Sequence, residues 1–194
     1  MGFTREELEA YRDEEVDDLV GGDVRLLLVG INPGLWTAAT NTHFAYPSNR
    51  FYPALHLAGI TPTPIDPNGA TDEDRTMLRG LGIAITNVVA RATARASELT
   101  REELRAGGEV VAAKVEDWQP NVVAFVGITA YRDAYGRRQA QAGRQPEDEW
   151  LAGTETWAVP NPSGLNAHET VDSLARAYHE VAVAAGLDVG DPRW

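Results

Sequence analysis

Two loop-forming segments contain the residues whose types could do chemistry. Segment 30–35 (Gly-Ile-Asn-Pro-Gly-Leu) and segment 160–168 (Pro-Asn-Pro-Ser-Gly-Leu-Asn-Ala-His) each follow a short apolar run. The chain has no cysteine, which excludes thiol nucleophiles and thiolate metal ligands, so its chemistry must use oxygen, nitrogen or ordered water. The amide of Asn32 cannot take a proton from water as a carboxylate can, but it can hold a water molecule in line for a carbon that already carries positive charge.

An ordinary structural role stands beside each chemical one. Asn-Pro-Gly is common in turns, so Asn32 could serve only to start a turn before Pro33. Leu165 has two interpretations as well: an exposed apolar wedge on a glycine-containing turn, or a hydrophobic staple that packs against the helix expected from residue 169. The sequence leaves both choices open.

Four apolar runs and five helical segments must position these loops. The runs are rich in β-branched and aliphatic residues, as in strands buried on both faces, and they cover residues 24–31, 83–89, 122–127 and 156–159. Helical patterns between and around them cover residues 50–58, 72–79, 101–118, 129–135 and 169–185. The helix over 101–118 is the best defined, because Thr100 caps it, Glu103 completes a capping box and Pro120 ends it.

The alternation of strands and helices predicts an α/β fold with a central, mostly parallel sheet of four to five strands, covered by helices on both faces. Ligands of such sheets bind beyond the carboxyl ends of the strands. The functional loops should therefore be those that begin at Asn32, Asn87, Gly127 and Asn161.

One domain is expected over residues 1–194, with an extra N-terminal helix over about 4–19. Thr4 precedes an acidic first turn there, and a weak apolar stripe follows it. Segment 140–153 is expected to be a polar hairpin or insertion. Because no apolar run is long enough to cross a bilayer and the first residues lack a signal-peptide pattern, a cytoplasmic protein without membrane contact is expected.

The charge balance favours another class of protein. With 17 basic and 29 acidic residues the net charge is −12, which repels a polyanion at long range, so a small-molecule-binding α/β protein is one alternative. The four histidines lack the spacing of a metal-ligand set, and no glycine-rich segment completes a nucleotide-cofactor motif. We therefore expect neither a metal nor a cofactor.

Three stretches together resemble a known family. Segments 30–35 and 160–168, combined with His-Phe-Ala-Tyr-Pro-Ser-Asn-Arg-Phe over 43–51, resemble the mismatch-specific uracil and thymine DNA glycosylases of the uracil-DNA glycosylase superfamily. The resemblance runs from about 26 to 181. It implies a three-layer α/β/α sandwich and a monofunctional hydrolase of base excision repair that flips its target base. That enzyme cleaves the N-glycosidic bond of uracil, and more weakly that of thymine or damaged pyrimidines, opposite guanine.

The resemblance also implies roles for particular residues. Asn32 matches the asparagine that positions the attacking water, Phe44 the aromatic that stacks on the extruded base, and Leu165 the residue that fills the gap in the duplex. Base contacts are implied for Ile31, Gly34, Phe44 and Asn87. Contacts to the duplex and its phosphates are implied for Asn161, Ser163, Gly164, Leu165, Asn166 and His168.

The implied partner is double-stranded DNA with G·U or G·T mismatches or damaged pyrimidines, bound by a single chain that joins the nucleoid when on DNA. One departure concerns the wedge: some relatives carry Ser-Arg directly after the leucine, whereas this chain has Asn166-Ala167-His168. A basic contact is missing there or moved to His168. Because Asn32 is not a chemically potent group, a non-catalytic module that binds uracil-containing or mismatched DNA is a second alternative.

Overall fold

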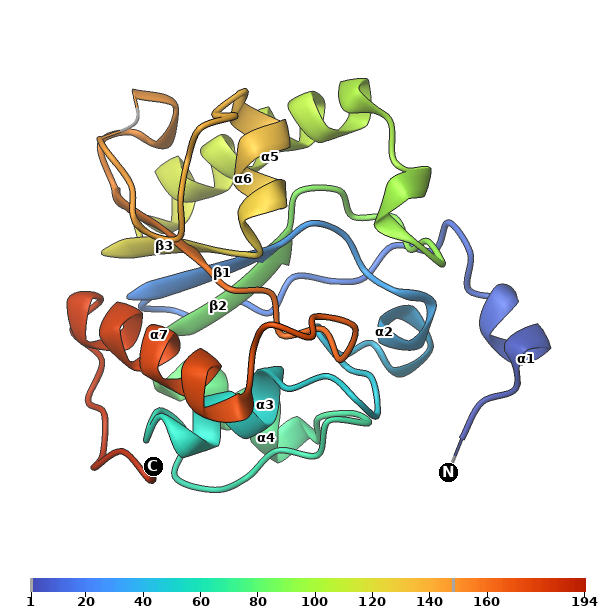
Figure 1. The fold of residues 1–194 in the computed structure, drawn as a ribbon, viewed down its shortest axis with the longest axis horizontal. Helices are drawn as coiled ribbons and strands as arrows, with labels where there is room; N and C mark the ends of the chain where they lie inside the picture. The colour runs from blue at the N-terminus through green and yellow to red at the C-terminus, as the bar shows by residue number, and fades with distance from the viewer. Residues whose placement is uncertain (1, 148) are drawn as a thin grey trace.

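The computed structural model describes residues 2–147 and 149–194; Met1 and Asp148, which belong to the expected domain, lie outside these ranges. Over the described residues a five-stranded sheet in the order β2-β1-β3-β5-β4 runs through the middle of the molecule (Figure 1). Its first four members are parallel, and β4 pairs antiparallel with β5. The strands are β1 (Leu26–Gly30), β2 (Ile83–Asn87), β3 (Val122–Val126), β4 (Gly143–Arg144) and β5 (Glu155–Val159).

Strands β1, β2 and β3 are buried along their whole length, as continuous apolar runs in a sheet covered on both faces must be. Leu28 of β1 lies between Ile85 of β2 and Ala124 of β3 in the register. This register brings Gly30, at the end of β1, beside Asn87, at the end of β2. The polar side chain of Asn87 therefore stands next to a residue that has no side chain.

Helices cover both faces of the sheet. In Figure 1 α5 and α6 lie on one side, and α3, α4 and α7 on the other. Leu55, Leu78 and Leu174 belong to one buried cluster, and Val111 and Tyr131 to the second. The predicted three-layer α/β/α sandwich is confirmed. The helices are α1 (Arg5–Glu9), α2 (Leu35–Thr40), α3 (Phe51–Leu57), α4 (Asp72–Gly80), α5 (Arg101–Trp118), α6 (Ile128–Tyr135) and α7 (Val171–Ala184), with short 3₁₀ turns η1 (Ala96–Glu98) and η2 (Glu149–Leu151).

The expected N-terminal helix over 4–19 is wrong beyond its first turns. Helix α1 has the predicted Thr4 cap but ends at Glu9. Asp13 then takes a left-handed backbone conformation (φ 64°), and Leu19 exchanges two backbone hydrogen bonds with Ile85 at 2.9 and 2.8 Å. Strand β2 lies at the edge of the sheet, so its outer backbone groups would lack partners without this segment. Pairing of this segment with β2 therefore outweighs the weak helical preference of its apolar pattern.

The segment expected as a polar hairpin or insertion forms β4 and η2 over its described part. No helix in the ranges 2–147 and 149–194 is long and apolar enough to span a membrane.

Candidate functional site

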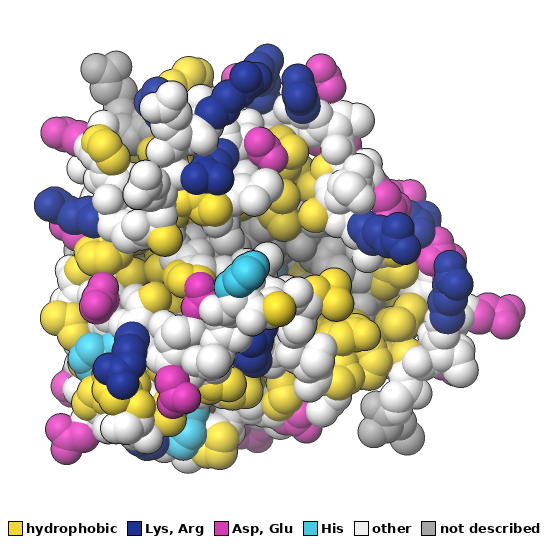
Figure 2. All heavy atoms as spheres, viewed as in Figure 1, with side chains coloured by type: hydrophobic (Ala, Val, Ile, Leu, Met, Phe, Trp, Pro, Cys, Tyr) yellow, Lys and Arg dark blue, Asp and Glu magenta, His cyan; other side chains and the backbone are white. Residues whose placement is uncertain are grey.

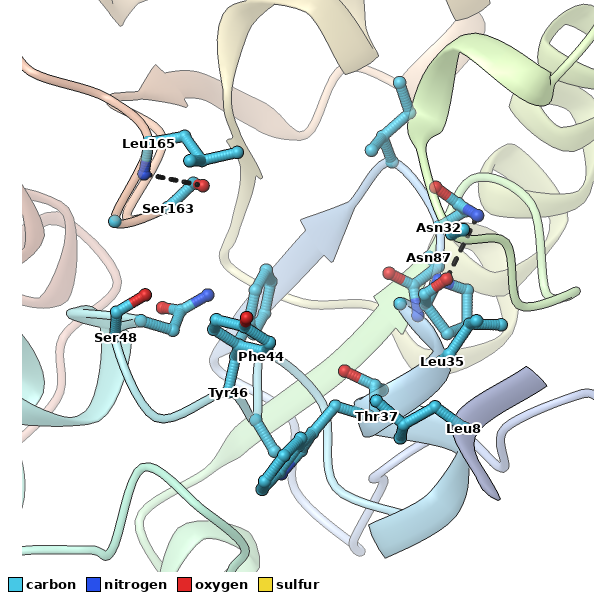
Figure 3. Close-up of a pocket in the computed structure, with 18 of the residues that line it drawn as sticks. Leu8, Asn32, Leu35, Thr37, Phe44, Tyr46, Ser48, Asn87, Ser163 and Leu165 are labelled. Atoms are coloured by element: carbon cyan, nitrogen blue, oxygen red, sulfur yellow. Dashed lines mark hydrogen bonds between the residues drawn. The ribbon is translucent and has the colours of Figure 1, made fainter. Parts of the chain in front are cut away.

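A cavity of about 1040 Å³ opens at the carboxyl ends of the parallel strands, where the sequence predicts the site. Figure 2 shows this view of the molecule hollowed near its centre, and Figure 3 shows the cavity in close-up. Two of the predicted residues, Asn166 and His168, do not line it. Those that do are Ile31, Asn32, Gly34, Phe44, Asn87, Asn161, Ser163, Gly164 and Leu165.

The Asn32 amide is held by its nitrogen. Nδ2 donates to Thr93 Oγ1 at 2.8 Å and to the carbonyls of Pro33 and Arg91 at 3.1 and 3.2 Å. Its Oδ1 accepts no hydrogen bond from the described part of the chain, so the side chain does not form the simple turn that starts before Pro33. The amide nitrogen is thus hydrogen-bonded to protein acceptors, and the oxygen remains available to a water molecule in the cavity.

The loop after β2, which supplies two of these acceptors, is itself fixed. The Arg91 guanidinium binds Glu103 of α5 at 2.6 Å and Asp13 of the N-terminal segment at 2.8 Å. Thr93 is buried, and its hydroxyl donates onward to the Arg95 carbonyl at 2.9 Å. The orientation of Asn32 therefore depends on residues about sixty positions away in the chain.

Phe44 lies on the opposite wall from the Asn32 loop, as Figure 3 shows. Its ring stacks on the fully buried Phe51, with centroids 4.1 Å apart and an interplanar angle of 29°. Its backbone has φ 58°, which is unusual for a bulky residue and stores strain. The packing on Phe51 fixes one face of the ring, and the ring borders the cavity.

Asn87 is oriented through the buried His43. Its Nδ2 lies 3.1 Å from His43 Nδ1, and His43 Nε2 lies 2.9 Å from the Asp17 carbonyl. Because a carbonyl only accepts, Nε2 carries the proton and Nδ1 accepts from Asn87. Burial lowers the pKa of His43, which keeps the ring neutral in this arrangement. The remaining amide oxygen of Asn87 is thereby directed away from His43.

Gly30 makes room for that oxygen. A Cβ at Gly30 would lie 2.4 Å from Asn87 Oδ1 and 3.3 Å from the Phe44 ring. Any side chain at Gly30 would therefore displace both neighbours. Asn87 Oδ1 and the Phe44 ring edge thus meet over one glycine at the base of the cavity.

Leu165 stands at the tip of the wedge loop, which we define as residues 160–168. It is 96% exposed, so the staple interpretation is wrong: the side chain does not pack on the helix that follows. The loop is shaped from within, because Asn161 Oδ1 accepts from Ser163 N at 3.0 Å and Asn166 N donates to the Ser163 carbonyl at 2.9 Å. The leucine side chain therefore projects from the loop tip and borders the cavity on its outer side.

The N-terminal segment also borders the cavity, which sequence reasoning missed. Leu8 lies near Leu35 and Thr37 in Figure 3, and Arg5 and Arg12 line the same space. The segment's tether is the contact of Phe3 with Trp36, at 4.9 Å between ring centroids, together with an ion pair of Arg12 with Glu98. The sequence of this segment indicated only a capped helix with a weak apolar stripe, which carries no signal for this placement.

Charges around the cavity mouth nearly cancel. Arg12 is paired with Glu9 as well as with Glu98, and Figure 2 shows basic and acidic side chains intermingled over the α1 end of the molecule. Within the described ranges no group of histidines and carboxylates is placed to hold a metal ion. Apart from the charged side chains of the N-terminal segment and several aliphatic ones, the cavity is lined by amides, hydroxyls, backbone groups and aromatic rings.

Fold and site together define an α/β/α protein whose ligand cavity lies at the carboxyl edge of a parallel sheet, between an amide-bearing loop and an exposed leucine. The chain belongs to the uracil DNA glycosylase superfamily, whose family model matches residues 18–182. The fold is similar to the solution NMR structure of a proposed uracil DNA glycosylase from Methanosarcina acetivorans. That comparison has a TM-score of 0.59 and 17% identity, and covers 91% of this chain and 98% of the other.

Membership of this superfamily supports DNA glycosylase activity in general, and DNA as the partner. It leaves open the subfamily, the preferred lesion and the residues that act. Residues 1–17 lie outside the matched region, although several of them line the cavity.

Proposed function

We propose that this protein is a mismatch-specific uracil/thymine DNA glycosylase that hydrolyses the N-glycosidic bond of uracil opposite guanine, and more slowly that of thymine or damaged pyrimidines. The observation that carries the proposal is the state of the Asn32 amide. Its nitrogen is held by three protein acceptors, and its unpaired oxygen belongs to the cavity that Phe44 also lines.

Capture of the base comes first. A pyrimidine inside a duplex must be flipped out, at an unstacking cost of a few kcal/mol. Stacking on Phe44 would recover about 1–3 kcal/mol of that cost. Leu165 would enter the vacancy as an apolar wedge, and the Ser163 and Gly164 backbone would contact a neighbouring phosphate.

Recognition of the base is assigned to Asn87. The N3 position of uracil and thymine carries a hydrogen, whereas N3 of cytosine is an acceptor. With its nitrogen committed to His43, Asn87 presents an oxygen, which accepts from uracil or thymine and repels cytosine. This assignment would let the enzyme reject the normal partner of guanine.

Bond cleavage leaves positive charge on the sugar and negative charge on the departing base, by analogy with glycoside hydrolysis. The backbone N–H groups of Asn32 and Gly34 donate no hydrogen bond within the described chain, so they are available to stabilise that anion. The water held by Asn32 Oδ1 would then attack the charged sugar carbon and release one proton, which neutralises the departed base anion. Bases with electron-withdrawing substituents should therefore leave faster.

Replacing Asn32 tests the proposal. We expect Asn32→Ala to lower single-turnover release of uracil from a G·U duplex by at least about a thousandfold, because the water loses the amide oxygen proposed to orient it. Affinity for a duplex with a non-cleavable 2′-fluoro-deoxyuridine opposite guanine should change less than about threefold. Excision at the wild-type rate would remove Asn32 from the mechanism.

The wild-type protein itself separates the alternatives. Release of free uracil from a G·U duplex distinguishes the enzyme from a non-catalytic binding module. Failure to bind any duplex would instead favour a small-molecule ligand. A panel of lesions opposite each of the four bases then tests the preference for guanine, which rests on the family resemblance and on backbone groups of the wedge loop.

A further inference from the structure

We propose that Arg50 is a positioning residue that locks the wedge loop onto the segment carrying Phe44, so that the wedge and the stacking ring are set as one unit before DNA binds. The inference deepens the proposed function and rests on it. The partner segment, residues 44–50, is called the stacking segment below. Arg50 does not line the cavity, so it acts through other residues.

Arg50 binds the wedge loop and Glu169, which precedes the cap of α7, at four backbone positions. Its guanidinium donates to the carbonyls of Ser163, Asn166 and Glu169, the Asn166 contact being 2.8 Å. Its own backbone N–H donates to the Pro162 carbonyl at 3.0 Å. One side chain thus spans the loop from before its tip to the residue that leads into α7.

The chemistry of these contacts suits arginine alone. The guanidinium is a planar fork with several donors in fixed directions, so it can serve three carbonyls at once, whereas a lysine ammonium on a flexible stem cannot match that geometry. No carboxylate forms an ion pair with Arg50 in the ranges that the structure describes, so the loop carbonyls are its partners. Its contacts are charge-assisted and therefore stronger than neutral ones.

A second contact joins the same two segments. A Cβ at Gly164 would lie 2.5 Å from Ser48 Oγ and 2.7 Å from the Ser48 carbonyl oxygen. The glycine beside the wedge leucine therefore rests directly on the stacking segment. Because Arg50 binds the loop carbonyls and Gly164 lies against Ser48, the backbone that carries Leu165 is held in place relative to the segment that carries Phe44.

This coupling has a functional consequence. Leu165 would fill the gap in the duplex at the same moment as Phe44 stacks on the flipped base, because the gap opens only when the base leaves the stack. A loop already held in place loses little freedom when the duplex binds, which favours tight binding. Loss of Arg50 should thus weaken capture of the flipped base, and should do so only while the wedge leucine is present.

A double-mutant cycle tests the proposal. Arg50→Met, Leu165→Ala and the double variant are compared with wild type for affinity to the 2′-fluoro-deoxyuridine duplex and for the single-turnover rate with G·U. We expect Arg50→Met alone to weaken affinity about tenfold. In the Leu165→Ala background the same change should cost less than about twofold. Arg50→Lys should recover part of the loss, and Arg144→Met, an exposed arginine paired with Glu155, should match wild type.

The outcomes distinguish failure of the positioning role of Arg50 from failure of the glycosylase assignment. Losses that multiply in the double variant, or wild-type affinity in Arg50→Met, would overturn the positioning role while leaving the glycosylase assignment intact. Wild-type protein that binds the duplex without releasing uracil would overturn the assignment, and the affinity cycle would still test Arg50. Wild-type protein that does not bind the duplex would overturn both. If Arg50→Met fails to fold, as judged by circular dichroism, Arg50→Lys and Gly164→Ala replace it in the same cycle.

Discussion

At the scale of single residues, the site works by fixing neutral groups rather than by adding charged ones. Asn32 and Asn87 each commit the nitrogen of an amide to the protein, which determines the direction of the oxygen. An amide that is free to rotate would present donor and acceptor in turn. The acceptors that prevent this, Thr93 Oγ1 for one and His43 Nδ1 for the other, are as necessary as the asparagines.

His43 makes the site and the fold sensitive to acid. In the unfolded chain a histidine binds a proton below about pH 6.5, whereas burial lowers the pKa of His43 in the folded protein. The unfolded state therefore binds more protons below that pH. Stability should be full above about pH 6.5 and fall as the pH drops toward the folded pKa, by at most about 1.4 kcal/mol per pH unit.

Urea unfolding between about pH 5 and 7.5 measures this slope. Excision by the folded protein should hold until the pH reaches the lowered pKa of His43 and decline only below it, because a protonated Nδ1 can no longer accept from Asn87. His43→Gln removes the titrating group, so we expect it to be less stable than wild type at neutral pH yet flatter in its acid dependence. An acid slope of the same size in His43→Gln would assign the effect to another group.

A site residue could be predicted from the sequence where its role depends on a short local motif, and not where it depends on a distant contact. Asn32, Phe44 and Leu165 stand in short, recognisable segments, so their types and neighbours suffice to suggest a role. The acceptors of Asn32 lie at Arg91 and Thr93, about sixty residues away, and no local pattern indicates such a contact. Arg50 lay inside one of those segments, but its target is three carbonyls, which have no sequence signature.

At the scale of elements, the sequence predicted those helices and strands whose limits are set by neighbouring residues. Helix α5 runs over Arg101–Trp118 as predicted, because its cap and capping box are encoded within a few residues. The N-terminal segment was mispredicted because its partner, the edge of β2, lies far along the chain. Helix α2, which starts directly after Pro33-Gly34, was not predicted at all, since the Asn-Pro-Gly signal read only as a turn.

Helix α5 packs very closely on the loop after β2, and this contact is testable. A Cβ at Gly107 would lie 2.0 Å from the Val88 carbonyl oxygen, so Gly107→Ala must push the helix away. We expect a loss of about 1–3 kcal/mol in stability. Excision should fall as well, since that loop leads to the acceptors of Asn32.

The matched control is Gly80→Ala at the end of α4, where nothing lies within 4 Å of the added carbon. This variant should be unchanged or more stable by up to about 1 kcal/mol. Thermal unfolding of both variants, followed by circular dichroism, gives the comparison. Equal destabilisation in the two would show that close packing at Gly107 is not the cause.

At the scale of the whole molecule, a net charge of −12 must be reconciled with a polyanionic substrate. Only Arg5 and Arg12 bring basic side chains to the described cavity lining, and Arg12 is neutralised by two glutamates. Binding should therefore rely on base capture more than on phosphate contacts. We expect the logarithm of the duplex affinity to fall with the logarithm of the salt concentration with a slope of about −1 to −3.

Fluorescence anisotropy of a 2′-fluoro-deoxyuridine duplex between about 50 and 200 mM salt measures this slope. A matched duplex without the lesion should bind too weakly to show a transition. A slope steeper than about −5 would reveal a large basic surface engaged with phosphates. That result would contradict the even mixture of charges on the face in Figure 2.

The solvent-facing leucine at position 165 allows duplex binding to be tested separately from the stability of the fold. A side chain that is 96% exposed contributes almost no burial to folding, so trimming it should leave the melting temperature unchanged. A form trimmed at this position should therefore fold as well as the parent protein. Any loss of duplex affinity that it shows can then be assigned to the missing contact and not to a damaged fold.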